Sequence, residues 1–175
     1  MKKKFIEEYE MKDIINKSSG QYKLLYKILA NTGKRITEVL SLRAEDVDCR
    51  AESITWTILK RKTPLVKTKK YDNPDLFLEI KKYVSEARVN DKDFLFAGRG
   101  KCGHLTRQAV DKNLKKIGRF SAHMFRHGVG HILAENDKTP FDIKHFLDHA
   151  TVRTTEHYGH VSGKRQLETT RLVRV

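Results

Sequence analysis

Side chains that could act in catalysis gather in the C-terminal part of this chain. Seven of the eight histidines lie between residues 123 and 160 of the 175. His123 and Arg126 are spaced i, i+3, so on a helix they share one face, and Tyr158 follows His149 by nine residues. Such a set suits attack on a phosphodiester, because a planar guanidinium can bind two phosphate oxygens at once. A tyrosine hydroxyl can be the nucleophile where neighbouring cations stabilise its phenolate.

The histidine spacing also permits a metal site. His127 and His131 form one pair at i, i+4, and His145 and His149 form another, a spacing found among zinc ligands. No glutamate stands where a His-Glu-x-x-His zinc protease has its base, and no cysteine lies nearby. Taken singly, histidines of this kind more often pack in a protein core. We therefore expect no metal and no other cofactor, and a zinc-dependent nuclease is the last of the alternatives.

Hydrophobic periodicity predicts that helices position most of these side chains. The strand Ser53–Leu59 alternates β-branched and aromatic residues, and with the basic stretch after it predicts a two- or three-stranded antiparallel ribbon over residues 53–71. Thr106 and Ser121 stand where N-caps belong, and Gly33 where a C-cap belongs. The expected helices cover residues 5–17, 21–30, 36–42, 75–84, 107–117, 122–135, 140–147 and 151–158. The predicted fold class is α+β, a mostly helical domain with one small antiparallel sheet.

The composition limits the partners and the setting. The 36 lysines and arginines exceed the 22 acidic residues by 14 charges, and the pI is near 9.8, which favours nucleic acid over plain solubility as the reason for the charge. A membrane surface is disfavoured, because no basic amphipathic helix exposes Trp or Phe. No apolar run approaches the roughly 18 residues of a membrane span, residues 1–6 lack a signal segment, and Cys49 and Cys102 make no disulfide framework. We expect one domain in the cytoplasm, associated with DNA.

Several stretches of the chain resemble, in order, the sequence boxes of one enzyme family. Residues 123–126, His-Met-Phe-Arg, are similar to the His-x-x-Arg box of the tyrosine recombinases of the phage-integrase type. Residues 147–150, Leu-Asp-His-Ala, resemble that family's Leu-Gly-His-Ser element, and residues 154–158 resemble its nucleophile helix. Upstream, residues 31–42 resemble its Thr-Gly-x-Arg-x-x-Glu box. The resemblance covers nearly the whole chain and implies the tyrosine recombinase catalytic-domain fold.

The resemblance also implies which side chains do the chemistry. Tyr158 would attack the scissile phosphate, leaving a 3′-phosphotyrosyl enzyme and a free 5′-hydroxyl. Lys60, at the end of the predicted strand, would protonate the leaving 5′-oxygen, and Lys62 is the alternative. Glu38 and Asp46 would support the first arginine box. The complete implied set of catalytic residues is Arg35, Lys60, His123, Arg126, His149 and Tyr158.

The phosphate itself would be held by two arginines and two histidines. Arg35 and Arg126 would clamp the non-bridging oxygens, where negative charge builds up during in-line attack. His149 would donate a hydrogen bond to the phosphate, and His123 would assist proton transfer at the tyrosine or the phosphate. The phosphotyrosine bond conserves the energy of the broken phosphodiester, so a 5′-hydroxyl can reverse the step without ATP.

Four positions depart from the family pattern. Lys34 stands where an apolar residue is usual, and we expect it to be exposed or in contact with DNA. Gly128 and Gly130 replace residues of higher helix propensity, at a cost of about 1 kcal/mol each. Asp148 replaces the usual glycine and puts a negative charge beside a proposed phosphate ligand. This charge argues against activity more than against the fold.

The expected domain organisation follows from the same resemblance. Recombinases of this type usually carry an N-terminal core-binding domain that closes round the duplex, but only 30 residues precede Asn31. We therefore expect residues 1–175 to be the catalytic domain without that clamp, binding double-stranded DNA weakly and with strong salt dependence. Residues 161–175 are expected to dock on a neighbouring protomer, in a homo-oligomer that is a tetramer in the synaptic complex. Further phosphate contacts are expected from the ribbon lysines and from Arg99, Lys101, Arg107, Lys112, Lys115 and Lys116.

Two other functions fit the same boxes. A type IB topoisomerase shares the tyrosine nucleophile but relaxes supercoils without paired sites or partner protomers. A DNA-binding module that kept the fold and lost activity is favoured by Asp148 and by the missing clamp. A covalent DNA adduct through Tyr158 separates both enzymes from the inactive module.

Overall fold

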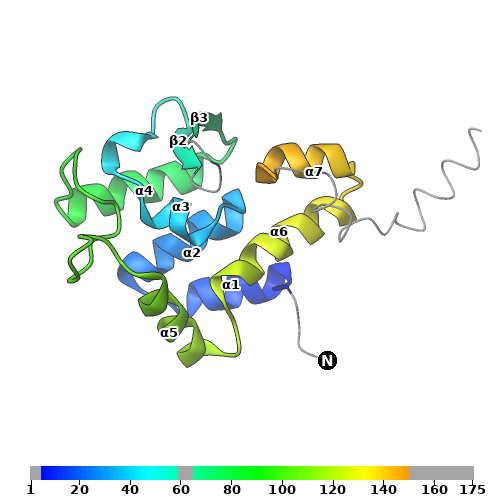
Figure 1. Ribbon diagram of the computed structural model, residues 1–175, viewed down its shortest axis with the longest axis horizontal. Helices are drawn as coiled ribbons and strands as arrows, with labels where there is room; N and C mark the ends of the chain where they lie inside the picture. The colour runs from blue at the N-terminus through cyan, green and yellow to red at the C-terminus, as the bar shows by residue number, and fades with distance from the viewer. Residues whose placement is uncertain (1–4, 59–64, 150–175) are drawn as a thin grey trace, which may run out of the picture.

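Seven α-helices, a short 3-10 helix and a three-stranded antiparallel sheet make up the described part of the chain, residues 5–58 and 65–149, in this computed structural model (Figure 1). This arrangement confirms the predicted mostly helical α+β class. The elements are α1 (Glu8–Asn16), α2 (Gly20–Thr32), α3 (Ile36–Leu40), the 3-10 helix η1 (Ala44–Asp46), β1 (Val47–Asp48), β2 (Ser53–Ile58), β3 (Leu65–Lys70), α4 (Pro74–Glu86), α5 (Arg107–Ile117), α6 (Ala122–Glu135) and α7 (Pro140–Leu147).

Helix α2 is the centre of the core. It packs against α1, α4 and α6, and it buries Leu25, Ile28 and Leu29 completely (Figure 1). From α6, Phe125 stacks on Tyr26 of α2, with ring centroids 5.6 Å apart. Each fully buried Leu or Ile stabilises the fold by roughly 1.5–3 kcal/mol. The packing of α2 against α6 therefore holds in place the residues that lie next to this contact.

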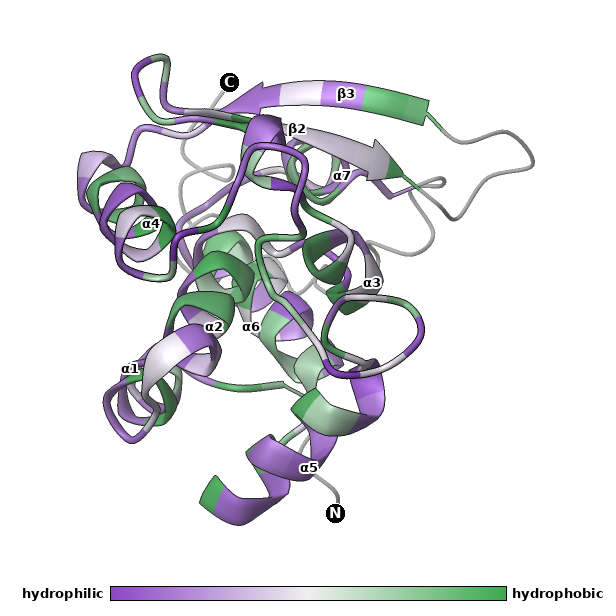
Figure 2. Ribbon diagram, turned by 90° about the vertical axis from the view of Figure 1, so that its left-hand side faces the viewer, coloured by the Kyte–Doolittle hydropathy of each residue, from purple (hydrophilic) through white to green (hydrophobic). Residues whose placement is uncertain are grey.

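The sheet has the order β1-β2-β3, with both pairs antiparallel. In the β2–β3 ribbon, Trp56 lies opposite Lys67 and Ile54 opposite Lys69, so these two lysines share the inner face of the ribbon with buried apolar residues. Figure 2 shows β3 hydrophobic at its start and hydrophilic over the rest of its length. The predicted ribbon is confirmed for the described residues. The third strand, however, is β1, which precedes the predicted range of 53–71.

Side-chain caps explain where two of the helices begin. The Thr106 hydroxyl accepts a hydrogen bond from the backbone N–H of Ala109 (3.1 Å) at the start of α5. At the start of α7, the Thr139 hydroxyl accepts from Asp142 N–H (3.1 Å), and the Asp142 carboxylate accepts from Thr139 N–H (2.8 Å). Ser121 does occupy the N-cap position of α6, but its side chain accepts no capping bond.

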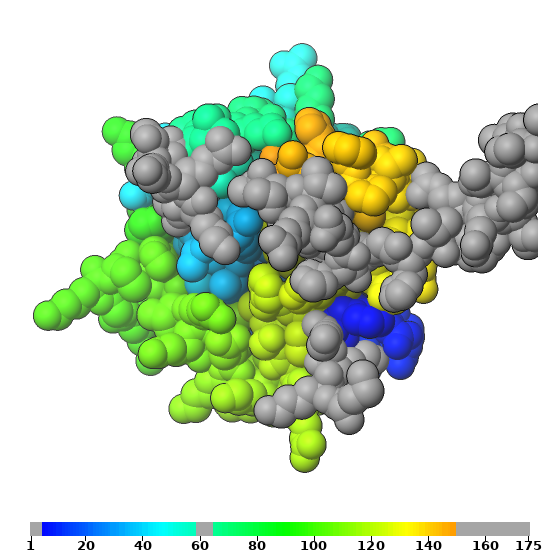
Figure 3. Space-filling view, turned by 45° about the vertical axis from the view of Figure 1, so that its right-hand side comes forward, coloured from blue at the N-terminus to red at the C-terminus, as the bar shows by residue number. Residues whose placement is uncertain are grey.

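Gly128 has a packing reason to stand in the middle of α6. The N-terminal segment crosses the helix there, and Ile6 N–H donates to the carbonyl of Met124 (3.3 Å). A Cβ atom at residue 128 would lie 2.1 Å from the carbonyl oxygen of Ile6, so only glycine fits without a shift of the backbone. Figure 3 shows the N-terminal residues, in blue, lying against this helix. The loss in helix propensity is therefore offset by a close contact between segments.

Candidate functional site

Arg126 connects two distant parts of the chain. It lies on α6, is almost fully buried, and donates hydrogen bonds to the carbonyls of Gly33 (2.8 Å) and Leu147 (2.6 Å). Gly33 has a left-handed conformation (φ 59°) as the C-cap of α2, as predicted, and a Cβ there would lie 2.5 Å from the Leu147 side chain. Glycine at this position thus lets the loop after α2 approach the end of α7, within reach of one guanidinium.

Arg35 lies two residues after Gly33, in extended backbone just before α3. Its guanidinium donates to the carboxylate of Glu38 (2.8 Å), and the same carboxylate accepts the backbone N–H of Arg35 (3.1 Å). Glu38 is buried, whereas the Arg35 side chain is 21% exposed. Asp46, the other expected support, instead accepts a hydrogen bond from the backbone N–H of Arg43 (2.8 Å).

His149 lies directly after the end of α7. Its backbone N–H donates to the carbonyl of Lys144 (3.0 Å), which fixes the turn that carries it. Partial burial, then the charges of Arg126 and Arg35, lower the pKa of His149 to about 4. The ring is therefore neutral at pH 7 in the free protein, a form that can still donate one hydrogen bond.

His123 has a similar electrostatic setting at the start of α6. Partial burial, then His127, Arg126, Arg107 and Arg35, lower its pKa to about 4. The His127 ring meets it edge-on, with centroids 4.5 Å apart. Both histidines thus lie within the field of the same two arginines. We call this group the arginine–histidine face: Arg35, His123, Arg126 and His149.

The remaining predicted site residues lie outside the part of the chain that the structure describes. They are the proposed nucleophile Tyr158 and the two candidate acids Lys60 and Lys62. The expected last helix, residues 151–158, and the tail, residues 161–175, lie outside it as well. The structure therefore brings together four of the six implied catalytic residues, and these come from three separate boxes of the sequence.

Lys34 contradicts the expectation from sequence. It is not exposed: its side chain has 0% accessible surface, and its ammonium lies 2.5 Å from the carboxylate of Asp148 and 5.0 Å from the centroid of Trp56. Burial lowers the pKa of this lysine, and the contact with Asp148 opposes that shift. Two of the departures from the family pattern are therefore each other's ion-pair partners, 114 residues apart in sequence.

Asp148 binds two further lysines, both from strand β3. Lys67 and Lys69 each lie 2.9 Å from its carboxylate, so three ammonium groups surround one carboxylate that is only 7% exposed. Burial raises the pKa of Asp148, but hydrogen bonds from Lys34, Lys69 and Lys67 outweigh it and hold the pKa well below its usual range. We call this group the lysine–aspartate cluster. The sequence signal was present: two opposite charges at two family positions that are usually uncharged.

Lys69 of β3 also caps the C-terminal end of helix α7 with its side chain. Its ammonium donates to the carbonyls of His145 (3.0 Å) and Phe146 (2.7 Å), in the last turn of the helix, where a cation is favoured by the helix dipole. Burial lowers the pKa of Lys69 to about 8, in spite of the contact with Asp148. Strand β3 is therefore attached to α7 by both the backbone carbonyls and the carboxylate.

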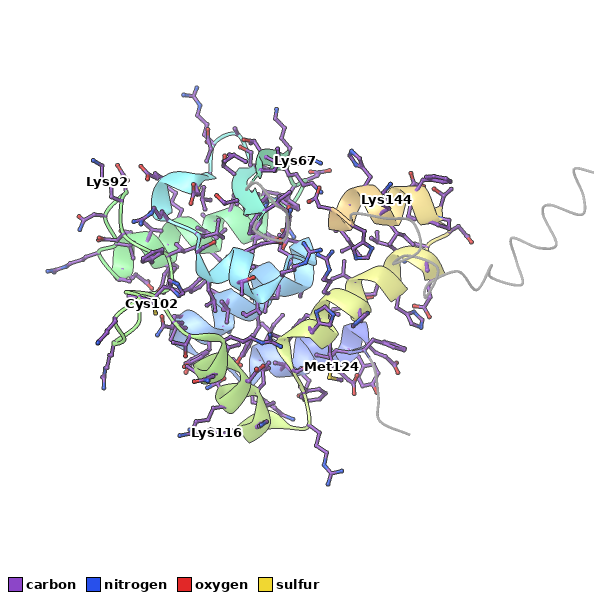
Figure 4. The ribbon with its side chains drawn as sticks, viewed as in Figure 1. Lys67, Lys92, Cys102, Lys116, Met124 and Lys144 are labelled. Carbon is purple, nitrogen blue, oxygen red and sulfur yellow. The ribbon has the colours of Figure 1, made fainter. Side chains whose placement is uncertain are left out.

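A groove of about 480 Å³ runs between β3 and α7. Ile58, the last described residue of β2, lines it together with Asp148 and His149. Figure 4 labels Lys67 on β3 and Lys144 on α7, at the edge of the molecule where the strand and the helix meet. The groove thus lies beside the arginine–histidine face, because His149 belongs to both.

Nowhere in the described part of the chain, residues 5–58 and 65–149, do three or more His, Cys, Asp or Glu side chains come close enough to hold a metal ion. Of its helices, none is both long enough and apolar enough to span a bilayer.

Comparison with known sequences gives one family. The model of the phage integrase family matches residues 4–165. Among curated proteins, a probable integrase/recombinase of Acholeplasma phage L2 is 29% identical over 161 residues, covering 87% of this chain and 53% of the phage protein. The tyrosine recombinase XerD of Listeria monocytogenes is 33% identical over 157 residues, covering 81% of this chain and 50% of the relative. The chain thus spans about half the length of these relatives.

Comparison with solved structures gives the same fold. The XerH site-specific recombinase in a pre-cleavage complex with its difH substrate has a TM-score of 0.71 at 21% identity, over 98% of this chain and 55% of the other. The catalytic domain of bacteriophage HP1 integrase has a TM-score of 0.68 at 19% identity, over 98% of this chain and 96% of the other. The fold is that of a tyrosine recombinase catalytic domain.

Proposed function

The chain belongs to the phage integrase family, and on this premise we propose that it cuts and rejoins double-stranded DNA as the catalytic domain of a tyrosine recombinase. The observation that carries the proposal is the position of Arg126. A single buried guanidinium bonds the carbonyl before Lys34 and the carbonyl before Asp148, and so it joins the segments that carry Arg35 and His149.

The phosphate would bind at the arginine–histidine face. Arg35 is half-buried and offers a planar guanidinium, while Glu38 sets its orientation. In-line attack spreads negative charge over the non-bridging oxygens, and pre-oriented cations stabilise that charge more than they stabilise the ground state. His149 is neutral at pH 7 and can donate a hydrogen bond to a phosphate oxygen without a change of protonation.

The covalent step would use Tyr158. Its phenolic oxygen forms a bond to phosphorus, the bond from phosphorus to the 5′-oxygen breaks, and the phenolic proton passes to His123 or to a phosphate oxygen. Lys60, or Lys62 in its place, donates a proton to the departing 5′-oxygen. Attack by a 5′-hydroxyl on the phosphotyrosine bond reverses the cleavage step, so rejoining needs no external energy source.

Assembly and location complete the proposal. The protein would act on DNA in the cytoplasm as a homo-oligomer, a tetramer in the synaptic complex, with residues 161–175 docked on a neighbouring protomer. The curated relatives and the DNA-bound XerH structure support DNA as the partner. Sedimentation of the protein with and without a two-site duplex tests the assembly, and a protein that stays monomeric on DNA contradicts it.

A covalent adduct is the decisive measurement for the function. The protein is incubated with supercoiled plasmid and with nicked duplexes in EDTA, then run on a denaturing gel. We expect a DNA–protein band that disappears in Tyr158→Phe and persists in the matched control Tyr9→Phe, which alters an exposed tyrosine on α1. If a DNA-binding domain is fused to the chain and no adduct forms, the inactive DNA-binding module is the better assignment. Relaxation of the plasmid alone does not separate the recombinase from a type IB topoisomerase, whereas a requirement for paired sites and partner protomers does.

A further inference from the structure

We propose that the lysine–aspartate cluster is a positioning element for the reaction, in which the buried carboxylate of Asp148 sets the relative placement of Arg35, Arg126 and His149. This inference rests on the proposed function, because it assigns those three side chains to one phosphate. Asp148 and Lys34 touch no substrate in this scheme, and both act through their neighbours in the chain.

The connectivity carries the argument. Lys34 immediately precedes Arg35, and Asp148 immediately precedes His149, so their ion pair at 2.5 Å joins the backbones beside two proposed phosphate ligands. Arg126 joins the same two segments one residue earlier, at Gly33 and Leu147. Two parallel links therefore connect the loop after α2 to the end of α7. The second link adds a constraint, one residue further along, on the relative placement of these two segments.

The cluster also attaches the β2–β3 ribbon to the loop after α2 and to the end of α7. Lys67 and Lys69 alternate along β3, so both point to the same face, and both reach the Asp148 carboxylate at 2.9 Å. Lys69 further bonds the last carbonyls of α7. One carboxylate thus holds three backbone segments together: the loop after α2, strand β3 and the turn that carries His149.

The burial separates this cluster from an ordinary surface ion pair. Exposed pairs such as Lys12–Glu8 are screened by water and set no geometry. By contrast, Lys34 is fully buried and has no water to replace the carboxylate. Asp148 also adopts a left-handed backbone (φ 52°), a conformation that favours glycine, so the carboxylate is present there in spite of a conformational penalty.

The reaction rate and the DNA affinity separate positioning from binding. Most affinity for DNA comes from exposed cations, whereas the rate of the chemical step depends on the geometry of the phosphate ligands. For Asp148→Asn, which keeps the size and tolerates the left-handed backbone, we expect single-turnover adduct formation on a nicked duplex to fall on the order of 100-fold. The dissociation constant for the same duplex should change by less than about threefold.

A double variant tests whether the two residues act as a unit. Lys34→Met combined with Asp148→Gly restores the family pattern, an apolar residue opposite a glycine, and removes both buried charges together. We expect this variant to form the adduct at least about tenfold faster than Asp148→Asn, a non-additive result that coupled residues give. The matched control, Lys12→Met with Glu8→Gln, removes an exposed ion pair and should leave the rate unchanged.

Amide hydrogen exchange tests the positioning role of the cluster independently of enzymatic activity. In Asp148→Asn, the amides of residues 148 and 149, bonded to the carbonyls of His145 and Lys144, should exchange faster, while that of Gly33, bonded to the carbonyl of Leu29, stays protected. Unchanged exchange together with a wild-type rate of adduct formation overturns the inference. If the wild-type chain fused to a DNA-binding domain forms no adduct, the proposed function fails, and the exchange result still decides whether Asp148 fixes the turn. If Asp148→Asn fails to fold, Lys67→Met, which removes the most exposed lysine of the cluster, replaces it.

Discussion

The lysine–aspartate cluster and the arginine–histidine face begin at neighbouring residues and differ in how far their cations are buried. Lys34 and Arg35 each bond a carboxylate of the same chain, but the Lys34 side chain has no exposed surface, whereas that of Arg35 is 21% exposed. A buried charge needs a partner inside the protein, because the loss of hydration is otherwise uncompensated. A half-buried cation keeps exposed surface on which an anionic ligand can bind. Position in the sequence therefore does not separate these two cations, but their exposure does.

A similar contrast between adjacent residues appears at the end of α7. Asp148 and His149 are adjacent, yet the carboxylate faces three lysines while the imidazole lies in the field of two arginines. The negative charge that looked harmful beside a proposed phosphate ligand is surrounded by three ammonium groups. Asp148 is thus compatible with catalysis, because the nearby cations outnumber it three to one.

The largest expected effect comes from changing the two adjacent cations separately. Lys34→Met leaves Asp148 buried with two lysines instead of three, and we expect unfolding in urea to show a loss of about 3 kcal/mol, the low end for a broken buried pair. Arg35→Lys keeps a cation beside Glu38, so stability should change by less than about 1 kcal/mol. Its adduct formation should fall on the order of 100-fold, because the planar fork that binds two oxygens is lost.

An exposed arginine provides the control for this pair. Arg88→Lys alters a surface side chain far along the sequence from either group, and neither quantity should move. A large loss of stability in Arg35→Lys, with normal stability in Lys34→Met, would reverse the assignment of the two regions.

An effect of medium size is expected from pH. The two regions should lose folding stability in different pH ranges. The folded pKa of both His123 and His149 is lowered from 6.5 to about 4, so the unfolded chain binds more protons between these values. Stability should therefore fall as the pH drops from about 6.5 towards 4. The pKa of Asp148 is also lowered, so the stability it contributes is complete above 3.8 and is lost only at lower pH.

Urea unfolding at several pH values measures both windows. The double variant His123→Asn with His149→Asn should flatten the decline between pH 6.5 and 4 and leave the loss below 3.8 in place. A decline of unchanged slope in this variant would mean that other groups cause it.

The smallest effect concerns the far end of helix α7. Thr139→Ala removes the capping hydroxyl and should destabilise the protein by about 1 kcal/mol. The rate of adduct formation should stay normal, because both regions attach to the other end of the helix. Ser121→Ala is the matched control, since Ser121 has the same position on α6 without a capping bond. A drop in rate for Thr139→Ala would show that the whole of α7, and not only its last turn, sets the geometry.

Much of the fold could be predicted from local patterns. The ranges of α5, α6 and α7 agree with the sequence prediction, because capping residues and apolar periodicity act within one or two turns. Strand β1 was missed because it has only two residues and depends on pairing with Ile54 and Ser53, a contact that no local pattern contains. Gly128 was misjudged for the same reason: its local helix propensity is poor, and its benefit lies in contact with a distant segment.

The sequence by itself determined the boundaries of α5, α6 and α7, the positive charge and the family boxes that contain Arg35, His123, Arg126 and His149. Only the tertiary structure decided that Lys34 is buried and that Asp148 is its partner. The physical reason is that propensity and capping are properties of neighbouring residues, whereas the fate of a charge depends on burial and on distance through space. Two residues 114 positions apart form a single ion pair because α6 packs against both α2 and α7 and so brings the loop after α2 to the end of α7.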